Sequence, residues 1–337
     1  MTARGAAAVV GSTVFAPGGD GRVYAFDTAT GNQLWATQIA NTANDEFLWS
    51  SAIPIGGGVY VGVATLEEAA CSLVVPGRLV GLDQATGAVT STWWSDVNQG
   101  AGGGIWTSAA FDQILGRIFV TTGNVANGVS ATSEPWQQAF VSIDPSTAHT
   151  ADSYQPIQTD FSTDWDFGAS PTLFDASGRH LIAAANKNGL VYALERTNLS
   201  GGVLWTSPIS GSGDSPDLGV GSIVSPTFAN GLLFVAGGAT TDGYPGAISA
   251  LDPATGTTVW KMHPDGFVLP AMAAAGGVLA AGVSHSDGTG RIYVLDQTSG
   301  AAVFTLATAG KIFGQPSWAN GVLYVVDLAG YLYALSP

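Results

Sequence analysis

The sequence predicts an all-β fold of short strands joined by tight turns, and both its composition and a repeated motif indicate this class. Of the 337 residues, 46% are apolar, only 10% are charged, and 46 are glycine. Long amphipathic helices normally carry many Lys and Glu residues, which are scarce in this chain. Short buried strands need little surface charge, and the turns between them use glycine.

The repeated motif is a strand-like segment, a tight turn and a second strand that carries a tryptophan. Its first copy runs from Gly21 to Asp27, continues through Thr30-Gly31, and reaches Trp35. Alternating β-branched and aromatic residues suit a strand that packs on both faces. Asp can accept hydrogen bonds from nearby backbone amides, and Gly tolerates positive φ, so Asp-x-x-Thr-Gly predicts a tight turn. Corresponding segments recur at residues 77–83, 139–144, 189–195, 247–252, 290–296 and 330–335.

The arrangement of these units predicts a β-propeller. The tryptophan ring on the strand after the turn can fill space between neighbouring sheets. Further hairpin strands, such as residues 57–61, precede the units. Four short strands in a unit of roughly 40 to 60 residues is the pattern of a propeller blade. We count seven units in one predicted domain over residues 1–337. The last unit stops before its Thr-Gly turn, so closure with an eighth blade stays open.

The charge balance argues against a nucleic-acid partner. Asp and Glu number 25 against 10 Lys and Arg, which gives a formal net charge of −15. Phosphate backbones bind to clusters of Lys and Arg, and the chain has no such cluster. An acidic surface can attract a basic redox partner or a cation, or it can simply aid solubility.

Other sequence features limit the classes of site and location. Cys71 is the only cysteine, so we expect no intrachain disulfide and no thiolate-rich metal site. No apolar run reaches the roughly 18 residues of a membrane span. The N-terminal residues show no signal-peptide pattern, so the sequence indicates either a cytoplasmic protein or a mature, trimmed chain.

The repeats resemble the PQQ repeat, which quinoprotein alcohol dehydrogenases share with outer-membrane assembly scaffolds of the same shape. The repeat covers nearly the whole chain, but it does not indicate catalysis, because a fold does not fix a function. Four motifs in the middle of the chain are more specific, and they follow one another over about 90 residues. They are Gly102-Gly-Gly-Ile-Trp106, Thr122-Gly-Asn124, Asp164-Trp-Asp-Phe-Gly168 and Asn186-Lys-Asn-Gly189.

This motif series resembles the active-site core of PQQ-dependent alcohol dehydrogenases, a group that includes the polyvinyl alcohol dehydrogenases. The resemblance implies that Trp106 is the floor on which the quinone stacks and that Lys187 hydrogen-bonds the quinone oxygens. Asn124 would offer its side-chain oxygen to Ca2+, a hard cation that prefers oxygen ligands. Asp166 would be the general base for the alcohol hydroxyl and a further metal ligand. Glu67 matches best the carboxylate that completes the metal site.

The same resemblance implies a function and a location. The chain would be a PQQ- and Ca2+-dependent dehydrogenase that oxidises an alcohol, with a secondary or polymeric alcohol among the candidate substrates. Electrons would pass to an external acceptor such as a cytochrome, because the chain has no haem-attachment motif. Quinoproteins usually work outside the cytoplasm, so the expected location is periplasmic or extracellular. Gly168 stands where lanthanide-using relatives carry an extra Asp, which favours Ca2+.

Each of these residues also has a purely structural interpretation. The Asp164-Trp-Asp166 segment can be a turn, Asn124 can be a turn residue with positive φ, and Trp106 can be blade packing. Lys187 can be a solvated charge in a turn. The vicinal cysteine pair of many family members is impossible with one cysteine. The alternative function is therefore a non-catalytic propeller that binds a protein or carbohydrate partner.

Overall fold

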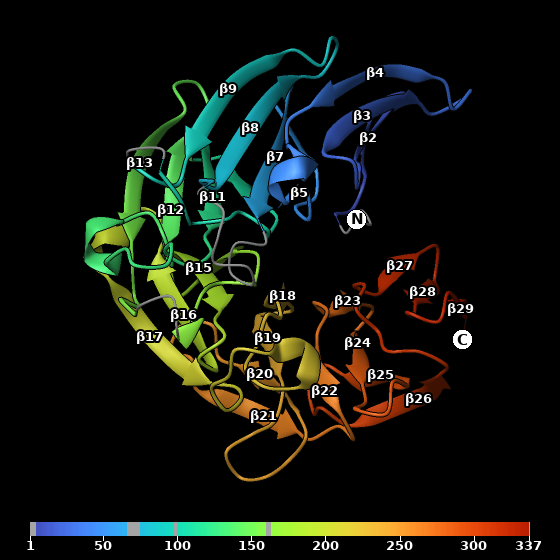
Figure 1. The fold of residues 1–337 in the computed structure, drawn as a ribbon. Helices are drawn as coiled ribbons and strands as arrows, with labels where there is room; N and C mark the ends of the chain where they lie inside the picture. The colour runs from blue at the N-terminus through green and yellow to red at the C-terminus, as the bar shows by residue number, and fades with distance from the viewer. Residues whose placement is uncertain (1–4, 66–74, 98–99, 160–162, 337) are drawn as a thin grey trace. The chain divides into compact units, whose positions relative to one another are not determined.

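The structure is a computed structural model that describes residues 5–65, 75–97, 100–159 and 163–336. Its regular structure is antiparallel β-sheet, interrupted in the described residues only by 3-10 turns of three residues such as Thr42–Asn44 (η1) and Ala131–Ser133 (η2) (Figure 1). The predicted all-β class is confirmed. No helix in this part of the chain has the length and apolar character needed to cross a membrane.

The chain divides into two compact units, and the first comprises residues 1–171 and 197–202. Its described strands form three antiparallel sheets, each built mainly from strands that follow one another in the chain. The first sheet contains β1 (Ala8–Val10), β2 (Thr13–Pro17), β3 (Arg22–Asp27) and β4 (Gln33–Gln38). The second contains β5 (Glu46–Phe47), β6 (Ile53–Ile55), β7 (Gly58–Thr65), β8 (Arg78–Asp83) and β9 (Val89–Trp94). The third contains β10 (Ala110–Asp112), β11 (Arg117–Thr121), β12 (Phe140–Asp144) and β13 (His149–Tyr154).

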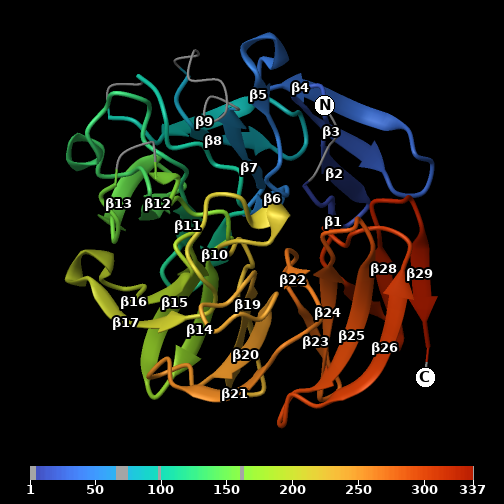
Figure 2. The same cartoon turned by 60° about the horizontal axis from the view of Figure 1, so that its bottom comes forward.

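The second unit comprises residues 172–196 and 203–337, and its described strands form four sheets (Figure 2). The first contains β14 (Thr172–Ala176), β15 (Arg179–Ala185), β16 (Leu190–Glu195) and β17 (Val203–Pro208). The next contains β18 (Thr227–Ala229), β19 (Leu232–Gly237), β20 (Ala247–Leu251) and β21 (Thr258–Met262). The third contains β22 (Phe267–Val268), β23 (Ala273–Ala275), β24 (Val278–Ser284), β25 (Gly290–Asp296) and β26 (Ala302–Thr308). The last contains β27 (Ser317–Ala319), β28 (Val322–Val326) and β29 (Leu332–Leu335).

The turns between the third and fourth strands of the sheets form as the repeated motif predicts. Oδ1 of Asp27 accepts hydrogen bonds from the backbone N–H of Ala29 and from both the N–H and the hydroxyl of Thr30, at 2.8 to 3.1 Å. These bonds, the Thr30 hydroxyl first, hold the pKa of Asp27 below its ordinary value. The glycine that follows has φ near +70°, which L side chains rarely adopt. The same bonds recur at Asp83, Asp252 and Asp296.

The tryptophans of the repeat join neighbouring sheets within each unit, as the sequence predicts. Trp35 of β4 donates its indole N–H to the carbonyl of Gln84, 3.0 Å away in the second sheet. Its ring lies on Gly87, where an added Cβ would come within 2.6 Å of the ring. Trp205 and Trp260 make the same pair of contacts with the turns that contain Gly256 and Gly300. At Gly87, Gly256 and Gly300 the turn therefore uses glycine for two reasons, the positive φ and the tryptophan ring of the preceding sheet.

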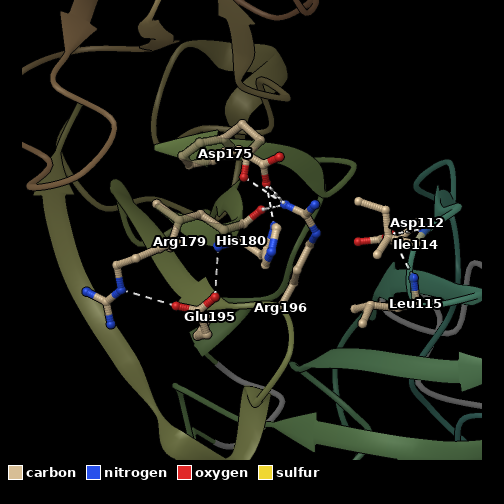
Figure 3. Close-up of polar contacts among 10 residues, drawn as sticks. Asp112, Ile114, Leu115, Asp175, Arg179, His180, Glu195 and Arg196 are labelled. Atoms are coloured by element: carbon tan, nitrogen blue, oxygen red, sulfur yellow. Dashed lines mark hydrogen bonds and ion pairs between the residues drawn. The ribbon is translucent and has the colours of Figure 1, made fainter. Parts of the chain in front are cut away.

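A charged cluster that no sequence motif predicts lies in the first sheet of the second unit. Asp175 in β14 accepts from Nδ1 of His180, 2.9 Å away, and from Nη1 of Arg196, 2.8 Å away (Figure 3). The buried Arg196 also donates to the carbonyl of Phe174 at 2.8 Å. The hydrogen bond from His180 is the largest cause that lowers the pKa of Asp175, followed by burial, which opposes it, and by Arg196.

Candidate functional site

Two of the predicted residues, Trp106 and Asp166, are in direct contact in the first unit. The indole Nε1 of Trp106 donates to Oδ2 of Asp166 at 3.3 Å. Asp166 is completely buried, whereas Trp106 keeps part of its surface exposed. Trp106 follows β9 and Asp166 follows β13, so the contact joins loops that are 60 residues apart in the chain. The ring of Trp106 thus has an indole edge directed at a buried carboxylate.

Three glycines place the Trp106 segment against the Asn124 segment. Gly102 and Gly103 have φ of +86° and +64°. The N–H of Gly103 donates to the carbonyl of Asn124 at 2.6 Å, and Gly104 accepts from the N–H of Gly123 at 2.8 Å. An added Cβ on Gly102 would lie 2.9 Å from the Asn124 carbonyl oxygen. These glycines therefore allow two backbone segments of the chain to approach each other closely.

Asn124 contacts the Asp-Trp-Asp motif through its side chain. Its Nδ2 donates to Oδ1 of Asp164 at 2.5 Å. Asp164 has φ of +46°, an uncommon conformation for a residue other than glycine. The hydroxyl of Thr121 donates to the carbonyl of Ala169 at 2.7 Å, which ties the end of β11 to the segment after this motif. Asn124 is 2% exposed, so its amide is held in the interior rather than in an open turn.

Gln138, which is not among the predicted site residues, completes this group. It lies just before β12, and its Nε2 donates to Oδ1 of Asn124 at 3.0 Å. Its backbone has φ of +49°, and its side chain is completely buried. Its Oε1 has no hydrogen-bond partner among the residues that the structure describes. No motif in the sequence marks it, because a glutamine at the start of a strand normally indicates nothing about chemistry.

Two further aromatic side chains, Trp49 and Phe47, form a row of ring contacts that begins at Trp106. The ring of Trp49 meets the ring of Trp106 edge-on, with centroids 6.2 Å apart and an angle of 74° between planes. Phe47 in turn lies 3.9 Å from Trp49, centroid to centroid. Aromatic pairs favour such edge-to-face arrangements, so Trp49 fixes the orientation of the Trp106 ring. Trp49 follows β5 and belongs to none of the four motifs.

Lys187 and Glu67 are the other predicted site residues. Lys187 lies in the second unit, in the turn between β15 and β16, where its carbonyl accepts from the N–H of Gly213 at 3.0 Å. It is only 5% exposed, so the interpretation as a solvated turn charge is wrong. Glu67 and Cys71 lie outside the described residues.

The donor set of the group suits a hard cation beside a flat ligand. Asn124, Asp164, Asp166 and Gln138 offer only carboxylate and carboxamide oxygens, the type that Ca2+ prefers. The buried Oε1 of Gln138, without a partner among the described residues, is the kind of atom that a bound cation satisfies. Trp106 adds a partly exposed aromatic surface next to these oxygens. The donor types present therefore fit a hard cation such as Ca2+.

A separate cavity of about 410 Å³ lies elsewhere in the first unit. An ion pair between Arg78 and Glu46, with Nη2 and Oε2 2.5 Å apart, forms part of its wall. Arg78 also lies over the ring of Trp94, 5.3 Å from its centroid. Among the described residues, none of those predicted for the quinone site lines this cavity.

Comparisons with solved structures identify the fold of this chain. Solved structures of similar fold include a europium-containing methanol dehydrogenase (TM-score 0.77, 19% identity, 99% of this chain and 72% of that one). BamB from Moraxella catarrhalis is also similar (TM-score 0.68, 18% identity, 98% and 84%). The predicted β-propeller class is therefore confirmed, and at these identities the likeness shows the fold alone.

Family comparisons give the membership of the chain. Residues 82–205 match the family described as the β-propeller domain of glucose/ethanol/alcohol dehydrogenases. Residues 187–281 and 244–337 match the family of the outer membrane protein assembly factor BamB. The chain belongs to the PQQ-repeat β-propellers and is homologous to quinoprotein alcohol dehydrogenases.

Two curated relatives show how far this homology extends. Quinohemoprotein alcohol dehydrogenase ADH IIB of Pseudomonas putida is 26% identical over 228 residues, which cover 57% of this chain and 32% of that protein. Polyvinylalcohol dehydrogenase of Sphingopyxis sp. (strain 113P3) is 24% identical over 371 residues, covering 89% and 55%. This chain therefore spans only part of these relatives: about a third of the first and about half of the second.

Proposed function

We propose that this protein is a quinoprotein dehydrogenase that uses PQQ and Ca2+ to oxidise an alcohol. The observation that carries the proposal is the contact of Trp106 with the buried carboxylate of Asp166, next to the linked pair of Asn124 and Asp164. Homology to quinoprotein alcohol dehydrogenases supports the same reaction class. Secondary and polymeric alcohols remain candidate substrates, and the location outside the cytoplasm is part of the proposal.

Each residue of the group has a defined task in this proposal. Trp106 offers its partly exposed ring to a flat ligand, and Trp49 packs against that ring. Asn124 offers its carboxamide oxygen to the cation. PQQ with Ca2+ supplies a two-electron acceptor polarised by a Lewis acid.

Asp166 is proposed as the general base and as a further ligand. General bases act within hydrogen-bond distance of the proton that they remove. In the proposed reaction the carboxylate of Asp166 would take the proton of the alcohol hydroxyl, and the hydride on the carbon that bears this hydroxyl would go to the quinone, leaving a carbonyl product. The Trp106 N–H, donated to Oδ2 at 3.3 Å, keeps that carboxylate oriented. Electrons then leave to an external acceptor such as a cytochrome. Lys187 is proposed to hydrogen-bond the quinone oxygens, and Glu67 is proposed to bind the cation.

The test measures cofactor binding first and turnover second. We expect purified protein to bind PQQ with Ca2+ at micromolar concentration, seen as a change in quinone absorbance, and to reduce a dye when alcohols are added. Asp166→Asn should keep the cofactor and lose dye reduction by at least ~100-fold, the usual contribution of a general base. Asp83→Asn, in a turn of the same unit, is the matched control and should keep full turnover. Retained turnover in Asp166→Asn would refute the role of this residue as the base.

A second candidate function rests on one observation. The residues that match the BamB family cover the whole second unit from residue 203 onward, and a BamB structure covers 98% of this chain. A non-catalytic propeller that binds a protein or carbohydrate partner is the function to adopt if PQQ does not bind.

A further inference from the structure

Gln138 stands in an arrangement that the proposed tasks of Trp106, Asn124 and Asp166 do not explain. Its side chain is completely buried, and its backbone has φ of +49°, which is uncommon outside glycine, Asn and Asp. Its N–H donates to the carbonyl of Gly123 at 2.9 Å. A strained residue is thus fixed directly against the Thr-Gly-Asn motif. Such outliers cluster at ligand sites, where the surrounding structure holds them in place.

The hydrogen bonds around Gln138 determine which way its carboxamide points. A carboxylate can only accept hydrogen bonds, so Oδ1 of Asp164 must face the NH2 group of Asn124, which lies at 2.5 Å. Oδ1 of Asn124 must then face the NH2 group of Gln138, at 3.0 Å. The chemistry of this chain of three residues therefore fixes both amides.

The consequence is a buried oxygen next to the proposed cation ligand. With its NH2 group directed at Asn124, Gln138 keeps Oε1 on the same carboxamide carbon, within a few ångströms of Asn124 Oδ1. That Oε1 is buried and has no hydrogen-bond partner among the described residues. A buried acceptor without a donor lowers stability, and a cation or its water satisfies it. Oδ1 of Asn124 has two lone pairs, so it can accept from Gln138 and still face a cation.

We propose that Gln138 belongs to the cation site: its Nε2 positions the oxygen of Asn124, and its Oε1 is a further oxygen donor for a hard divalent cation. This inference rests on the proposed function, since it concerns the same cation. It extends that function with a residue outside all four motifs. Partners that orient a metal ligand typically change metal affinity by 10- to 100-fold when they are removed.

The test compares three variants by Ca2+ affinity, which is measured by calorimetry on PQQ-saturated protein. Gln138→Met keeps the size of the side chain and removes the carboxamide, with its hydrogen bonds from Nε2 to Asn124 and to Thr159. Gln138→Gly also relieves the positive φ. The matched control is Gln137→Met, because Gln137 is equally buried, donates to the carbonyl of Ala101 at 2.8 Å, and likewise has an Oε1 without a partner among the described residues. We expect both Gln138 variants to weaken Ca2+ binding at least ~10-fold and the Gln137 variant to bind as the wild type does.

Melting temperatures in EDTA and in Ca2+ separate a role in cation binding from a structural role. In EDTA, Gln138→Gly should melt at or above the wild-type temperature. When Ca2+ is added, its melting temperature should rise less than that of the wild type. Unchanged Ca2+ affinity in both Gln138 variants, beside a wild type that binds PQQ and Ca2+, overturns this inference and leaves the proposed function intact. A wild type that binds neither overturns both.

Discussion

At the scale of single residues, the first unit buries the carboxyl group of Glu134. Glu134 follows η2 and is 6% exposed. Burial first, and then the negative charge of Asp96, raise the pKa of Glu134 above its ordinary value, although the backbone N–H of Val97 opposes this rise by donating to it. Its Oε2 has no hydrogen-bond partner among the described residues. Folding therefore favours the protonated form of this carboxyl.

The raised pKa of Glu134 predicts how the stability of the fold depends on pH. A carboxyl with a higher pKa in the folded state stabilises the fold below its unfolded pKa of about 4.3, and this contribution is lost as the pH rises through the folded value. Glu134→Gln should therefore melt above the wild type at pH 8 and equal to it at pH 4. The exposed control Asp214→Asn should match the wild type at both pH values. A Glu134→Gln protein that melts below the wild type at pH 8 would contradict the interpretation.

At the scale of elements, the contact between a tryptophan and a turn glycine joins one sheet to the next. The glycines of these turns share nearly the same φ, between +71° and +73°, but they differ in their surroundings. A Cβ on Gly300 would lie 2.5 Å from the ring of Trp260, whereas a Cβ on Gly31 would have nothing within 4 Å. A comparison of alanine substitutions at Gly31 and Gly300 therefore separates the cost of backbone strain from the cost of packing against a ring.

We predict that Gly300→Ala is more destabilising than Gly31→Ala. Both substitutions cost about 1–2 kcal/mol of backbone strain. Gly300→Ala adds an overpacking cost of about 1–3 kcal/mol against Trp260, because the ring is held by its 2.8 Å hydrogen bond to the Gln297 carbonyl. The measurement is the free energy of unfolding in urea. In a Trp260→Leu background, the extra cost at residue 300 should shrink, and equal costs of the two alanine variants would refute the packing argument.

The sequence predicted the elements well because each repeat carries its own turn chemistry. Asp27 and Thr30 make their hydrogen bonds within a few residues, so local spacing is enough to predict them. Gln138 and Trp49 could not be predicted in this way. Their contacts with Asn124 and Trp106 depend on how separate loops pack, and no local spacing records that packing.

At the scale of the whole molecule, the four sheets of the second unit are not equally complete. The last sheet contains three described strands, in the order β27-β28-β29, and β29 pairs only with β28 among the described residues. Tyr331 and Leu332 are 58% and 65% exposed. The strands β24 and β25 instead pair over seven residues, and each has a further neighbour. The single-domain prediction for residues 1–337 stays a prediction.

This difference predicts the order of local opening. Backbone amides of β28 and β29 should exchange with solvent earlier than those of β24 and β25, because exposed edge strands with few buried contacts open first. Hydrogen exchange followed by mass spectrometry measures this directly, with the peptides from β24 and β25 as internal reference. Equal protection of both sheets would show that the last sheet is as stable as the others.

The most direct test of the account is a crystal structure of the protein grown with PQQ and Ca2+. The account predicts the quinone against the ring of Trp106 and a cation bound by the oxygens of Asn124 and Asp166. A quinone bound elsewhere, or crystals without either group at saturating concentrations, would contradict it and leave a propeller that acts as a scaffold.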